Sequence, residues 1–60
     1  MKMDIERALR NMDKTNRDLV KDYVEAYKRT GDQKYAREAI AILENFDDDS
    51  DVKELIKTLK

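Results

Sequence analysis

Hydrophobic residues recur along this chain at spacings of three and four, which is the period of one face of an α-helix. The first such set is Ile5, Ala8, Leu9 and Met12. Three further stretches show the same period, and runs of polar residues separate them. The pattern predicts four helices, over about residues 4–12, 16–30, 32–46 and 50–59.

Polar residues that favour helix N-termini precede the later three stretches. Thr15 is followed three residues later by Asp18, an arrangement similar to a capping box, so we expect the second helix to start at Asn16. Asp32 is placed to cap the third helix, and Asp49 or Ser50 to cap the fourth. The predicted caps therefore agree with the hydrophobic period.

Gly31 marks the clearest boundary in the chain. It is the only glycine, and Lys28 and Arg29 precede it, where positive charge favours the carbonyl end of a helix. Glycine readily adopts the left-handed conformation that ends a helix. The sequence thus predicts a tight helical hairpin whose structural turn is Gly31. In the competing interpretation Gly31 lies inside one uninterrupted helix.

The helical phases also predict a core. We expect the following residues to be mostly buried, with Ile40 contributing most to stability: Leu19, Tyr23, Tyr27, Ala36, Ile40, Leu43, Phe46, Leu55 and Ile56. Tyr23, Tyr27 and Tyr35 are expected to cover the hairpin with the ring inward and the hydroxyl at water. The predicted fold is an all-α compact bundle of four helices, and residues 1–60 form a single domain.

Composition supports a helical, soluble chain and narrows its chemistry. The 60 residues include one Gly and no Pro, and 40% are hydrophobic while 45% are charged. Without Cys or His the chain can form no disulfide and lacks the commonest zinc ligands and catalytic bases. We therefore expect no enzymatic activity, no catalytic residue, no cofactor and no metal. The longest apolar run, Ala39 to Leu43, is too short to span a bilayer, so we expect a cytoplasmic protein without a membrane segment.

The second and third predicted helices contain spacings found in a known repeat family. Tyr27 precedes Gly31 by four residues, Ala36 follows it by five, and Ile40 comes four residues later. Over about residues 20–48 the chain resembles a tetratricopeptide-repeat hairpin. Val24 and Asp48 stand where that family has a small residue and a closing proline. The resemblance implies a lone hairpin flanked by helices that act as caps.

Basic residues form a candidate nucleic-acid contact. Arg7, Arg10, Lys14, Arg17 and Lys21, followed by Lys28, recur at spacings of three, four and seven. They would align on one face if the first two helices were continuous, and such stripes bind phosphate backbones in a salt-dependent manner. Carboxylates are interspersed among them, so a solvated helix surface is the favoured interpretation. Residues 2–37 hold ten Lys/Arg and seven Asp/Glu (+3), whereas residues 38–60 hold three and seven (−4).

A seven-residue pattern allows another arrangement of the same region. It comprises Ile5, Leu9, Met12, Asn16, Leu19, Tyr23, Ala26 and Thr30. As a coiled-coil seam it would require one long helix over residues 4–30 and pair two chains, with Asn16 setting the register. The alternative, which we favour, makes residues 13–16 a turn.

Asp47, Asp49 and Asp51 stand at alternate positions, as in the first part of a calcium-binding loop. The later positions do not fit, because Val52 replaces the required Gly and Thr58 replaces the bidentate Glu. We therefore predict a solvated acidic turn that caps a helix.

These observations favour a non-enzymatic helical scaffold or protein-interaction module, with a protein partner or self-association and neither a nucleic-acid partner nor a membrane. The alternatives are a nucleic-acid-binding module that uses the basic stripe and a coiled-coil-like homodimer. Regular caps and patterns are also typical of a computationally designed mini-protein without a biological function.

Overall fold

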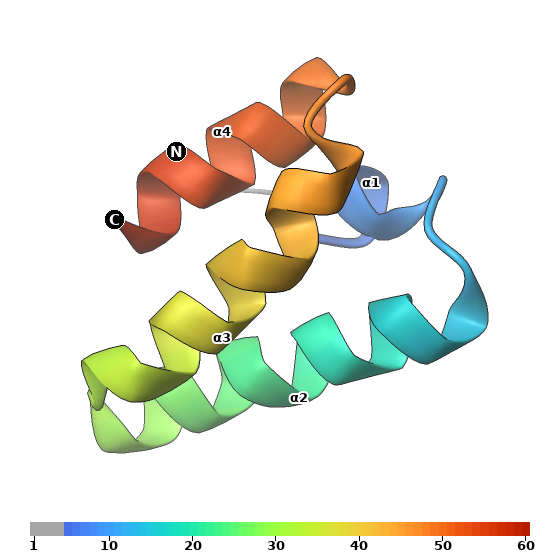
Figure 1. Ribbon diagram of the computed structural model, residues 1–60. Coiled ribbons are helices and arrows are strands. Elements are labelled where there is room, and N and C mark those ends of the chain that lie inside the picture. The colour runs from blue at the N-terminus through green and yellow to red at the C-terminus, as the bar shows by residue number, and fades with distance from the viewer. Residues whose placement is uncertain (1–4) are drawn as a thin grey trace.

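The computed structural model describes residues 5–60, and the regular secondary structure of this part of the chain is helical. The elements are α1 (Ile5–Leu9), α2 (Lys14–Thr30), α3 (Gln33–Leu43), the 3-10 helix η1 (Glu44–Phe46) and α4 (Ser50–Leu59). In Figure 1, α3 rises diagonally from the turn after α2 toward α4, and α1 lies behind them. The Cα radius of gyration is 10.3 Å, close to the value of about 10 Å expected for a compact chain of this length. The predicted all-α bundle is confirmed.

The first helix is shorter than predicted. Its predicted start at Asp4 lies outside the described residues, and the helix ends at Leu9 rather than at Met12. The Met12 N–H donates to the Leu9 carbonyl at 3.0 Å, and the Met12 side chain is buried. Asn11 and Asp13 have side chains that compete with the helical backbone for hydrogen bonds. The chain therefore leaves the helix and turns Met12 into the core.

The second helix begins two residues before its predicted start. Asp13, not Thr15, is the N-cap, and its carboxylate accepts hydrogen bonds from the Asn16 backbone N–H (3.3 Å) and from Asn16 Nδ2 (2.7 Å). Asp13 has extended backbone dihedrals, with φ −66° and ψ 160°. This conformation ends any continuity between α1 and α2. The single helix over residues 4–30 that the coiled-coil alternative requires is thus wrong for the described part of the chain.

The hairpin turn at Gly31 is confirmed. Gly31 has φ 73° and ψ 9°, and its N–H donates to the Tyr27 carbonyl at 2.7 Å, as expected for a helix that ends in a left-handed residue. Asp32 then caps α3, since its carboxylate accepts from the Lys34 N–H at 3.0 Å. The Tyr27 hydroxyl accepts from Gln33 Nε2 across the turn at 3.2 Å.

The third helix ends before its predicted limit at Phe46. After Leu43 the backbone tightens into η1, and α4 starts at Ser50 as predicted. Residues 47–49 are three consecutive aspartates, which are unfavourable at the negative end of the helix macrodipole. Asp49 instead caps α4, and its Oδ1 accepts from the Asp51 N–H at 2.8 Å.

The core differs in part from the predicted one. Ala36, Leu43, Leu55 and Ile56 are buried as expected, whereas Tyr23, Tyr27, Ile40 and Phe46 are half-buried and Leu19 is 41% exposed. The other buried residues are Ala8, Leu9, Met12, Val20, Val24, Ala39, Val52 and Leu59. The prediction that Leu19 is buried is therefore wrong, and Ile40 is less buried than Leu43. The apolar side of α2 is wide, and its buried residues are Val20 and Val24, each one position after Leu19 and Tyr23.

Candidate interaction surface

The residues of the predicted basic stripe lie on different segments. Arg7 belongs to α1, Arg10 to the connection after it, and Lys14, Arg17 and Lys21 to α2. Their alignment depended on a continuous helix, and the break at residues 10–13 removes that condition. The structure therefore places Lys14, Arg17 and Lys21 on one helix without extending the same face through Arg7 and Arg10.

Among residues 5–60, ion pairs are formed by three of the five basic residues. Lys21 Nζ lies 2.7 Å from Glu6 Oε1 and joins α2 to α1, and Arg7 Nε lies 3.6 Å from Asp51 Oδ2 and joins α1 to α4. Lys14 Nζ contacts Asp18 Oδ2 at 2.9 Å within α2, and this hydrogen bond lowers the pKa of Asp18. Lys21 and Arg7 thus connect segments that the hydrophobic core also holds together.

The acidic turn stabilises the start of α4. Asp49 accepts from the Asp51 N–H and, through Oδ2, from Asn11 Nδ2 at 3.0 Å. Both hydrogen bonds lower the pKa of Asp49, and the bond from the Asp51 backbone N–H has the larger effect. No three carboxylates of residues 5–60 are grouped so that they could hold a metal ion. The turn therefore acts as a helix cap and as a link to the connection between α1 and α2.

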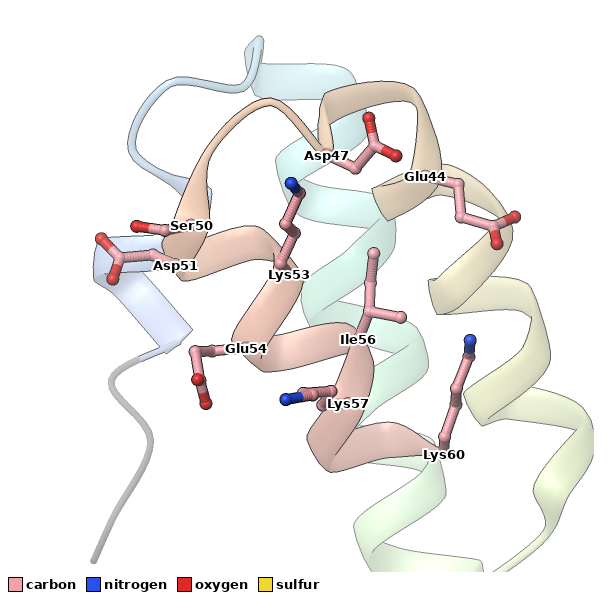
Figure 2. A pocket seen from close by; sticks show the side chains of 9 residues that line it. All are labelled: Glu44, Asp47, Ser50, Asp51, Lys53, Glu54, Ile56, Lys57 and Lys60. Atoms are coloured by element: carbon pink, nitrogen blue, oxygen red, sulfur yellow. The ribbon is translucent and has the colours of Figure 1, made fainter.

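An open groove of about 640 Å³ runs along α4 (Figure 2). Its lining residues are Glu44, Asp47, Ser50, Asp51, Lys53, Glu54, Ile56, Lys57 and Lys60. Figure 2 shows the lining side chains spread around α4 and along η1 rather than converging on one point. Four carboxylates and three ammonium groups line it, so the groove has only a small net charge, and it is open rather than enclosed.

An exposed apolar surface lies on α2. Leu19 is the one exposed large hydrophobic residue among residues 5–60, with 41% of its surface accessible, and Tyr23 and Ala26 beside it are half-buried. Because an α-helix turns about 100° per residue, these three residues at spacings of four and three lie along one side of α2. We call Leu19, Tyr23 and Ala26 the α2 strip.

The α2 strip is visible in the sequence, because its three residues belong to the seven-residue pattern. The helical phases nevertheless predict that two of them, Leu19 and Tyr23, are core residues. Hydrophobic period alone does not indicate which part of a wide apolar arc faces the neighbouring helices. The sustained spacing of four and three through Leu19, Tyr23 and Ala26 was the signal that could have identified the strip.

Comparisons with protein-family models, curated proteins and solved structures found no match to this chain. Within the described residues, no helix is long and apolar enough to cross a membrane.

Proposed function

We propose that this chain is a non-enzymatic helical scaffold that acts as a protein-interaction module through the α2 strip. The observation that carries the proposal is the 41% exposure of Leu19, since the other large aliphatic side chains of residues 5–60 are buried or half-buried. Removing apolar surface from water stabilises a complex by about 25 cal/mol per Å². An exposed leucine beside a half-buried tyrosine is therefore a favourable contact for another helix.

The hairpin supports the same proposal. Tyr27, Gly31, Ala36 and Ile40 keep the spacings that resemble a tetratricopeptide repeat, and the chain turns at Gly31. A single repeat of that family cannot bury its hydrophobic surface alone and relies on a neighbour. A lone hairpin with a partly exposed apolar side fits a module that completes its packing on a partner.

The ion pairs favour a structural role for part of the basic stripe. A phosphate backbone would compete with Glu6 for Lys21 and with Asp51 for Arg7, and both carboxylates belong to the helix contacts of the bundle. Charged residues that bind nucleic acid are most effective when no neighbouring carboxylate opposes the phosphate. Protein binding is therefore the function that we favour over binding to nucleic acid.

The proposal is tested by titrating the isotope-labelled chain with a synthetic amphipathic helical peptide and recording amide NMR shifts. We expect the largest shifts at Leu19, Tyr23 and Ala26, and small ones along α4. A scrambled peptide of the same composition, which has no apolar face, is the control. Leu19→Asp should remove the response while leaving the helical content unchanged, because Leu19 is already exposed. Shifts centred on the α4 groove, or no shifts at all, would contradict the proposal.

A further inference from the structure

We infer that the α2 strip binds a second copy of this chain, with the two α2 helices antiparallel about a twofold axis. This inference rests on the proposed interaction role and names its partner. The coiled-coil alternative required a helix through residues 4–30, which the break before Lys14 excludes. The later part of the seven-residue pattern, however, remains on α2, where Leu19, Tyr23 and Ala26 form the strip.

Antiparallel pairing matches the side chains of the strip by size. The residues of a helix seam occupy two alternating heptad positions, a and d. In an antiparallel helix pair a residue at position a packs against a residue at position d of the partner. With the twofold axis between Tyr23 and Ala26, the large Tyr23 ring faces Ala26 of the partner subunit, and Ala26 faces the partner's Tyr23. Leu19 then lies at the level of the partner's Thr30. Each bulky residue thus meets a small one, which allows the two helices to approach closely.

Charge complementarity selects this register. Asp22 and Arg29 are both exposed, lie seven residues apart on the same border of the strip, and have no ion-pair partner among residues 5–60. In the antiparallel register Asp22 lies beside the partner's Arg29, and the twofold axis repeats the pair. A parallel pairing would instead bring the two Asp22 side chains to the same level. Opposite charges at such border positions set helix orientation.

The test uses two charge reversals, Asp22→Arg and Arg29→Asp, in the full chain. Sedimentation velocity at about 0.01 to 1 mM should show a concentration-dependent dimer for the wild type, because a single helix pair forms a small and weak interface. Each variant alone places like charges at both border pairs and should weaken the dimer by about 5- to 10-fold. An equimolar mixture of the two variants restores both attractive pairs and should form a heterodimer with an affinity close to that of the wild type.

Control variants separate this arrangement from a general effect of charge. Arg37→Asp makes the same charge change on an exposed position of α3 and should leave the dimer intact. Leu19→Asp should abolish it, and circular dichroism should show every variant to be as helical as the wild type. A wild type that stays monomeric at the highest concentration, or single variants that dimerise as well as their mixture does, would overturn the inference. If the chain stays monomeric but still binds the amphipathic peptide, the dimer is refuted and the proposed interaction role stands. If the chain neither dimerises nor binds the peptide, both the dimer and the interaction role are refuted.

Discussion

Replacement of Gly31 is the most direct test of the hairpin. Gly31 ends α2 with φ 73° and is the only residue with positive φ in the described part of the chain. A Cβ added at Gly31 would meet no heavy atom within 4 Å. The cost of Gly31→Ala therefore comes from the backbone conformation and not from a steric clash with neighbouring side chains.

Two opposing terms give the magnitude. Holding an L-residue in the left-handed conformation costs about 1–2 kcal/mol. Replacing Gly also restricts the unfolded chain, which returns about 0.4–1 kcal/mol. We expect Gly31→Ala to lower the free energy of unfolding by about 1 kcal/mol and the Tm by about 4–8 °C. Gly31→Asn should cost less, because Asn tolerates positive φ better than Ala does, and Gly31→Val should cost more.

Chemical denaturation of the wild type and the variants measures these differences. A chain of this length is accessible to chemical synthesis, so D-alanine at position 31 provides a matched control. D-alanine favours positive φ and should raise the free energy of unfolding, because it restricts the unfolded chain without straining the native turn. If Gly31 lay inside a continuous helix, L-alanine would instead stabilise the protein by about 1 kcal/mol through its higher helix propensity. A gain in stability for Gly31→Ala would refute the hairpin.

Three further predictions address the core, the helix caps and the basic residues. Leu43→Ala should lower the free energy of unfolding by about 2–5 kcal/mol. Ile40→Ala should lower it by clearly less, because Leu43 is completely buried and Ile40 is half-buried. Equal losses of stability in urea denaturation would contradict this prediction. Hydrogen bonds lower the pKa of Asp13 and Asp49 below the ordinary value of 3.8. The stabilisation that these ionised caps provide is therefore present above about pH 4 and is lost as the pH falls through the lowered pKa values. In an acid titration followed by circular dichroism, the helical content of Asp49→Asn should depend less on pH than that of the wild type. Light scattering with a short DNA duplex at about 50 mM salt should show no change in mass, and a salt-sensitive complex that is lost in Lys21→Glu would instead support nucleic-acid binding.

The basic N-terminal region and the acidic C-terminal region of the sequence contact each other in the structure. The N-terminal region carries the excess of basic residues and the C-terminal region the excess of acidic ones. Arg7 pairs with Asp51, and Asn11 binds Asp49, so the connection after α1 and the start of α4 lie against each other. Since Arg7 and Asp51 are exposed or nearly so, the pair contributes little free energy by itself.

The sequence by itself determined the features that depend on neighbouring residues. The number of helices, the turn at Gly31, the cap at Asp32 and the full extent of α4 were all predicted. Each depends on hydrogen bonds and dihedral preferences within about one helical turn, so a short window of sequence contains the necessary information.

The tertiary structure alone decided which side of α2 is buried, and it also contributes to where α1 ends. The end of α1 is coupled to the Asn11–Asp49 hydrogen bond, whose residues lie 38 positions apart in the chain. Burial of Val20 in preference to Leu19 depends on how the other helices pack against a wide apolar arc that no single neighbour covers. Helical periodicity describes which residues share a side of a helix, but the direction in which that side points is decided by contacts between distant segments. The exposed strip on α2 is the consequence of that packing.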